Sequence, residues 1–208
     1  MLFDISRSEL ADCFGEDRLA TLPAGAFPPV IADTEGARLL QTVGVPTGTL
    51  RLRALEEDCG RLPLVKDVVH AETLEDAPDG AGDWPVIGWL LDAHLALAST
   101  PGSGSGAVYA FDLDEEGARE LHADVSSLVQ VTFRFQRLLE EFTFSHDGGE
   151  EAGYERLERE VERIREETSS IDPFPFQDDE TIWSVVGEEI AAGQRFRAGS
   201  PGARSLFG

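Results

Sequence analysis

The fold is decided by residues 84–112, which read WPVIGWLLDAHLALASTPGSGSGAVYAFD. Three short segments of this stretch, Trp84–Leu90, Ala93–Ala98 and Ala107–Phe111, are rich in apolar and aromatic residues and are separated by turn-forming residues. This pattern predicts three β-strands, because such side chains pack well on a pleated, half-buried sheet. We therefore expect a β-meander whose first turn is Leu91-Asp92.

The connection between the second and third strands is long and rich in glycine and serine. Residues Ser99–Gly106 contain Thr-Pro-Gly and a Ser/Gly repeat, a composition typical of a mobile loop. A phosphate-binding loop would be followed by Lys-Ser/Thr and a helix start, and neither is present. We interpret the segment as a linker, and the meander by itself as a core element without chemistry.

The composition indicates a soluble, strongly acidic protein. Of 208 residues, 41% are hydrophobic and 27% are charged, which is compatible with one globular domain. With 40 Asp and Glu against 17 Lys and Arg, the formal net charge is −23. This charge disfavours nucleic acid or an anionic membrane as the direct partner and favours fast association with a basic protein. An acidic surface that serves only solubility is the alternative.

Nothing in the sequence indicates membrane insertion or secretion. No apolar run reaches the roughly 18 residues of a membrane-spanning helix. The N-terminus, MLFDISRSEL, lacks the basic and apolar regions of a signal peptide. The two cysteines, Cys13 and Cys59, form no CxxC motif and are expected to be reduced thiols in the cytoplasm.

Two short helices and one strand are predicted before the meander. A capping-box pattern, S-x-x-E, opens a helix at residues 6–9. Asp33 or Thr34 can cap a second helix, which places Ala37, Leu40 and Val43 on one face and is followed by Gly44. Gly48–Leu55 alternates apolar residues with Arg51 and Arg53 and is predicted to be a strand with one solvent-exposed face.

Loops and one ambiguous segment complete this half of the chain. Residues 16–33 and 72–83 contain several Pro and Gly and are predicted to be loops, and 112–119 is predicted to be a polar turn. Residues 62–69 are short and apolar, so either a strand or a helical turn fits them.

Residues 124–142 fit two patterns. Val129, Val131, Phe133 and Phe135 alternate as in a strand, whereas the spacing of three and four between other apolar residues is that of a helix. The length and the possible N-cap Asp124 favour the helix. A helix would place Phe135 and Leu138 in the core and expose Arg134.

The C-terminal part is predicted to be helical with a disordered end. Tyr154–Glu167 is predicted to be an amphipathic helix with three i,i+4 ion pairs, Glu155–Arg159, Arg156–Glu160 and Arg163–Glu167. The two prolines of the IDPFPF segment at 171–176 predict an extended segment. A last helix, with Trp183 on its inner face, ends at Gly193, and the Gly/Ser/Arg-rich residues 194–208 are predicted to be a disordered tail.

The sequence contains no recognised catalytic or metal-binding motif. The four histidines, His70, His94, His122 and His146, have no partner at the spacing of a metal site. No GxSxG, P-loop or GxGxxG motif is present. We expect His94 to be a structural or surface histidine, and we expect no metal or cofactor.

Acidic side chains and one tryptophan are the candidates for contacts with a partner. Between residues 140 and 180, 15 Asp or Glu stand against 4 Lys or Arg. This excess fits either a solvated helical face or a surface that imitates nucleic acid and occupies a basic cleft. Trp89 is a candidate anchor if it lies on the exposed side of the meander, and a core position is the alternative. The candidate charged contacts lie in the turn after the meander and are Asp112, Asp114, Glu115 and Glu116.

Several segments occur in the order seen in the SUKH superfamily of bacterial immunity proteins. They are FGEDRLATLP, ARLLQTVGVP, VIGW leading to GAVYAFD, SSLVQVTFRFQRLL, and DP followed by ETIWSVVGEEIAAG. The resemblance extends from about Ser6 to Gly193 and is closest to the fourth group of the superfamily. The chain departs from the usual pattern at STPGSGSG, where a compact turn would be expected.

The resemblance implies a single α+β domain over residues 1–193, with an antiparallel sheet and flanking helices. It also implies a helix at 125–142 and no catalytic residues. The implied function is that of a cytoplasmic antidote that binds and blocks a polymorphic toxin, commonly a nuclease or a nucleic-acid deaminase with a basic cleft. Two alternatives stay open: a regulatory protein-binding module of the same fold, and an enzyme with an unrecognised site.

Overall fold

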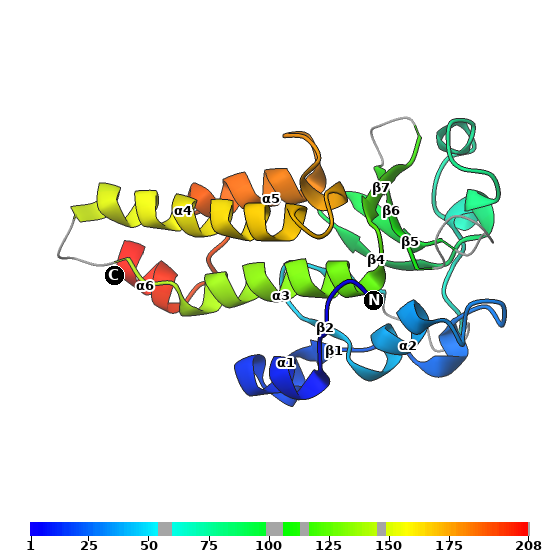
Figure 1. Ribbon diagram of the computed structural model, residues 1–208, viewed down its shortest axis with the longest axis horizontal. Helices are drawn as coiled ribbons and strands as arrows, with labels where there is room; N and C mark the ends of the chain where they lie inside the picture. The colour runs from blue at the N-terminus through cyan, green and yellow to red at the C-terminus, as the bar shows by residue number, and fades with distance from the viewer. Residues whose placement is uncertain (54–59, 99–105, 113–116, 145–148, 208) are drawn as a thin grey trace. The chain divides into compact units, whose positions relative to one another are not determined.

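The computed structural model describes residues 1–53, 60–98, 106–112, 117–144 and 149–207 (Figure 1). The chain divides into two compact units, Met1–Gln130 and Val131–Gly208. Antiparallel sheets lie in the first unit and helices lie in both, so the predicted α+β class is confirmed. A single domain over residues 1–193 stays a prediction.

In the described part of the first unit, a five-stranded antiparallel sheet has the order β3-β4-β5-β6-β7. The three central strands are the predicted meander, which is confirmed (Figure 1). Leu91, at φ 51°, makes the tight turn between β4 and β5. The strands are β3 (Arg51–Leu52), β4 (Val86–Leu90), β5 (Ala93–Leu97), β6 (Val108–Asp112) and β7 (Arg119–His122).

Three strands were not predicted. The end of the expected polar turn at 112–119 begins β7, which pairs with β6. In addition, β1 (Leu19–Ala20) pairs with β2 (Val45–Pro46), where a loop and a helix end were expected. These strands are two to four residues long. Their sequences carry little strand signal because pairing with a distant segment, rather than a local pattern, stabilises them.

The two predicted N-terminal helices are confirmed with their caps. In α1 (Arg7–Phe14), the Ser6 hydroxyl accepts a hydrogen bond from the Glu9 amide at 3.2 Å. In α2 (Glu35–Thr42), Thr34 accepts from the Ala37 amide at 3.3 Å. Short 3-10 helices complete this unit, and one of them shows that residues 62–69 form a helical turn. They are η1 (Glu16–Arg18), η2 (Ala24–Ala26), η3 (Val65–Asp67), η4 (Glu72–Leu74) and η5 (Ala81–Asp83).

Trp84 is the centre of a buried cluster on one face of the five-stranded sheet. Its ring lies 4.7 Å from that of Tyr109 and 6.4 Å from that of Phe111, both on β6. The segment that contains η3, η4 and η5 covers this face with Val65 and Ala81, which are buried. The predicted loop at 72–83 is therefore a covering layer of the core, held by apolar side chains.

Residues Val125–Glu141 form one continuous helix, α3, so the helical prediction is confirmed. The Asp124 carboxylate caps it by accepting from the Ser127 amide at 3.0 Å, and its other oxygen accepts from the Leu2 amide at 2.8 Å. Two details were wrong. Leu139, rather than Leu138, is buried together with Phe135, and the half-buried Arg134 pairs with Glu167 at 2.7 Å.

The second unit is built from helices. Here α4 (Gly149–Ser169) and α5 (Ile182–Ala191) lie side by side (Figure 1). The buried rings of Phe135 and Trp183 stack at 5.6 Å, and Phe176 meets Phe135 edge-on at 6.1 Å. Thr181 caps α5 by accepting from the Ser184 amide.

The predicted i,i+4 pairs on α4 are confirmed in part. Glu155 and Arg159 approach to 3.8 Å, and Arg163 and Glu167 to 3.0 Å. The third predicted pair, Arg156–Glu160, is replaced. Arg156 donates to the Thr143 carbonyl, and Glu160 accepts from Arg163 at 2.7 Å.

Two segments of this unit differ from the sequence prediction. The expected extended segment contains a 3-10 helix, η7 (Phe174–Phe176), because the buried Asp172 carboxylate accepts from the Phe174 amide at 3.2 Å and turns the chain. The expected disordered tail contains α6 (Pro201–Phe207). Phe196 precedes this helix and packs on the rings of Phe142 and Phe144 at 6.1 and 5.7 Å, which gives the segment an apolar attachment that its overall composition hides.

Candidate partner-binding site

Trp89 lies on β4 and is half-buried, in contrast to the fully buried Trp84. In the ladder it stands opposite Arg51 on β3 and His94 on β5. Directly opposed residues of an antiparallel sheet point to the same face. The three side chains therefore form a row across one face of the sheet.

Arg53 adds a second guanidinium to this row. Its backbone amide donates to the Ile87 carbonyl at 2.9 Å, which extends the pairing beyond β3, and its guanidinium lies 5.9 Å from the centre of the Trp89 ring. This is a cation–π geometry. Neither Arg51 nor Arg53 forms an ion pair with another residue of the described part of the chain. We name Arg51, Arg53, Trp89 and His94 the Trp89 surface, and it is locally basic although the chain is acidic.

Gly88 allows this arrangement. A Cβ atom at this position would lie 2.4 Å from the Arg51 carbonyl oxygen and 3.1 Å from the Leu52 Cα. Real Cβ atoms do not approach backbone atoms so closely, so any other residue would move β3 away from β4. The glycine is therefore the reason that the two arginines reach Trp89.

His94 is half-buried, and its Nδ1 atom has no hydrogen-bond partner in the described structure. Burial, and secondly the positive charge of Arg53, lower the pKa of His94 below its ordinary value. The imidazole is therefore neutral at neutral pH. The negative charge of an anionic group placed on the Trp89 surface would favour the protonated imidazole and act to raise this pKa.

Asp112 is the one predicted acidic contact within the described residues, and the sheet does not bring it together with Trp89. Asp112 ends β6 opposite Ala93, a neighbour of His94, so alternation along the strands places Asp112 and Trp89 on opposite faces. The exposed Asp76 lies beside Gly117, where a Cβ would be 3.6 Å from that of Asp76. The loop before β7 thus has an acidic neighbour that the sequence did not identify. Asp114, Glu115 and Glu116 lie outside the described residues.

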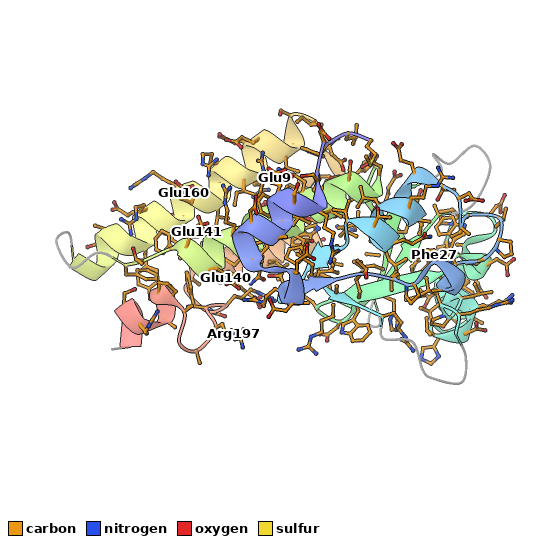
Figure 2. The ribbon with its side chains drawn as sticks, turned by 90° about the horizontal axis from the view of Figure 1, so that it is seen from below. Glu9, Phe27, Glu140, Glu141, Glu160 and Arg197 are labelled. Atoms are coloured by element: carbon orange, nitrogen blue, oxygen red, sulfur yellow. The ribbon has the colours of Figure 1, made fainter. Side chains whose placement is uncertain are left out.

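The regional excess of acidic residues predicted for 140–180 lies largely on helices of the second unit. Glu160 on α4 and Glu140 and Glu141 at the end of α3 are among these side chains (Figure 2). Many carboxylates of α4, such as Glu158 and Glu162, are exposed. This distribution gives the second unit an acidic surface, whereas the residues of the Trp89 surface belong to the first unit.

Neither a metal site nor a membrane-spanning helix is found in the described structure. No group of three or more His, Cys, Asp or Glu among the described residues has the geometry to hold a metal ion. None of the described helices combines the length and the apolar character needed to cross a bilayer.

Sequence comparison assigns the chain to a family. A family model described as "SUKH-4 immunity protein" matches residues 5–189, most of the chain and parts of both compact units. Neither a search of curated proteins nor a search of solved structures found a match.

Proposed function

Because the chain belongs to the SUKH-4 immunity protein family, we propose that it neutralises one cognate toxin by direct, reversible binding and without chemistry of its own. The observation that carries this proposal is the family match over residues 5–189. An immunity protein acts where its toxin would otherwise damage the producing cell, so the site of action in this proposal is the bacterial cytoplasm.

We further propose that the toxin is a nuclease or a nucleic-acid deaminase. The clefts of such enzymes are basic because they bind polyanions. The net charge of −23 supports this partner, since opposite charges raise the encounter rate and suppress wrong partners. Occupation of the cleft by an acidic surface would exclude the nucleic acid substrate.

Trp89 is the proposed aromatic anchor of the complex. A half-buried tryptophan can be desolvated further on binding, and such residues often dominate binding energy. Arg51 and Arg53, which form no ion pair with another described residue, favour an acidic or aromatic group of the toxin opposite Trp89. The charged residues after the meander, Asp112, Asp114, Glu115 and Glu116, remain the proposed acidic contacts.

The test uses the toxin domain encoded beside this protein, purified in an inactive form, with surface plasmon resonance at two salt concentrations. Replacing the four carboxylates after the meander by Asn or Gln should slow association and flatten its salt dependence. The matched control neutralises four exposed carboxylates near the N-terminus, namely Asp4, Glu9, Asp12 and Asp17.

Replacing Trp89 by Ala should instead speed dissociation, because the anchor is lost while long-range charge is unchanged. Trp89→Phe keeps an aromatic ring, so its dissociation rate should lie between those of the wild type and Trp89→Ala. If the wild-type protein does not bind the toxin domain at micromolar concentration and co-expression does not protect cells, the proposed function is wrong.

A further inference from the structure

A pocket of about 220 Å³ opens between α4 and α5 in the second unit. This volume is several times the roughly 30 Å³ that one water molecule occupies in the liquid, so the pocket can admit a side chain. Its floor contains the buried residues Trp183, Phe176 and Gly187. Because Gly187 has no side chain, the space above it stays open, and a Cβ there would already lie 3.1 Å from Val161.

The rim of this pocket is negatively charged. Glu158 and Glu162 on α4 and Glu188 on α5 line it, and all three are exposed. None of the three carboxylates forms an ion pair or a side-chain hydrogen bond with another described residue. By contrast, Glu160 and Glu167, which also lie on α4, pair with Arg163.

The basic residue of the lining is already engaged. Arg165 donates to the exposed Asp179 carboxylate at 2.8 Å. Three unpaired carboxylates therefore surround an apolar floor, and the charge of the lining favours a cation.

We propose that this pocket receives a cationic side chain, arginine or lysine, from a protein partner. The aliphatic part of such a side chain would cover the apolar floor while its charged end meets the carboxylates of the rim. An anionic side chain would be repelled by the three carboxylates. A purely apolar side chain would remove water from them without supplying a compensating charge. That this partner is the toxin rests on the proposed function. The preference of the pocket for a cationic side chain is independent of that function.

The first experiment tests the pocket without the toxin. The ¹⁵N-labelled full chain is titrated with N-acetyl-arginine amide, N-acetyl-lysine amide and, as an uncharged probe, N-acetyl-norleucine amide. We expect the cationic probes to shift the backbone amides around Glu158, Glu162 and Glu188 and the indole N–H of Trp183. A stronger shift by one cation identifies the preferred side chain.

A charge-matched pair of variants locates the effect. The triple variant Glu158→Gln/Glu162→Gln/Glu188→Gln should lose the localised shifts. The control Glu9→Gln/Asp12→Asn/Asp17→Asn removes the same charge from exposed positions of the first unit and should keep them. The proposal is overturned if no localised shift occurs, if norleucine amide shifts the same signals equally, or if the triple variant responds like the wild type.

The second experiment repeats the toxin-binding measurement with these two variants. The pocket variant should weaken binding by roughly tenfold or more, and the control should change mainly the association rate. Toxin binding that is equal in the two variants overturns the pocket as a toxin contact and leaves the proposed function standing. Absence of toxin binding by the wild type refutes the proposed function and leaves the probe titration as a separate result.

Discussion

His122 should make the folded protein sensitive to mild acid. The residue is completely buried at the end of β7, and its Nδ1 atom lies 2.9 Å from the Ser127 hydroxyl oxygen. Burial lowers the pKa of His122 from 6.5 to about 3. In the folded state the imidazole therefore stays neutral at a pH where the unfolded chain already binds a proton.

The sign and size of the effect follow from proton linkage. Above pH 6.5 both states are neutral and His122 contributes no pH dependence; below it the unfolded state gains a proton and stability falls. The loss continues until the pH approaches the folded pKa of about 3. With a slope of about 1.4 kcal/mol per pH unit, this histidine alone should remove about 2 kcal/mol of stability between pH 6.5 and about pH 5.

Urea unfolding followed by tryptophan fluorescence measures this quantity. The wild type and His122→Gln are compared at several pH values between about 7.5 and 5. A glutamine at this position is uncharged, so the variant's own destabilisation is independent of pH, and the difference between the two proteins should shrink by about 2 kcal/mol over this range. The control His70→Gln changes an exposed histidine and should leave the pH dependence unchanged. A constant difference between wild type and His122→Gln would refute the reasoning.

Three further predictions concern the stability of the chain. Asp124→Ala should reduce the free energy of unfolding by about 2 kcal/mol, because it removes the cap of α3 and the acceptor for the Leu2 amide. Asp124→Asn can still accept a hydrogen bond at the cap and should lower the free energy of unfolding less in the same denaturant titration. Gly88→Ala should cost about 1–3 kcal/mol because its Cβ collides with the Arg51 carbonyl, and a variant as stable as the wild type would contradict the close approach of β3 and β4. Thermal unfolding should be one cooperative transition by circular dichroism and by fluorescence, with the same midpoint in EDTA; two separated transitions would show that residues 1–193 are not one domain.

The sequence predicted those parts of the fold that local chemistry determines. The caps of α1, α2 and α3 depend on a side chain and an amide three residues away, so Ser6, Thr34 and Asp124 could be identified as candidates without coordinates. The meander was equally visible, because each strand has its own apolar pattern and its neighbours are adjacent in the chain. The apolar residues of the 124–142 segment fit both the alternation of a strand and the three-and-four spacing of a helix. The length of the segment and the cap candidate Asp124 favoured the helix that is observed.

The parts that were missed depend on distant partners. The strands β1 and β2 pair across more than twenty residues, and β7 has a mixed polar sequence whose pairing with β6 no local pattern reveals. The ring of Phe196 contacts those of Phe142 and Phe144, which lie about fifty residues earlier in the chain, so the composition of the tail could not indicate these contacts.

The candidate site shows the same limit. Trp89 could be singled out as an aromatic residue, and Arg51 and Arg53 were expected on an exposed strand face. That the three share one surface requires the register of β3 against β4, which joins residues nearly forty positions apart. The sequence identified only carboxylates as candidate charged contacts, whereas the charged side chains that the described structure places beside Trp89 are those of Arg51 and Arg53.

The close contact at Gly88 separates positions that can diversify from one that cannot. Arg51, Arg53 and Trp89 project from the sheet, and their side chains can be exchanged without altering the backbone that carries them. Gly88 must stay constant because every larger residue would displace β3 from β4. If the Trp89 surface is the toxin contact proposed above, a library for binding a different toxin would randomise the three projecting positions and keep residue 88 as glycine, so that the backbone of the sheet stays unchanged.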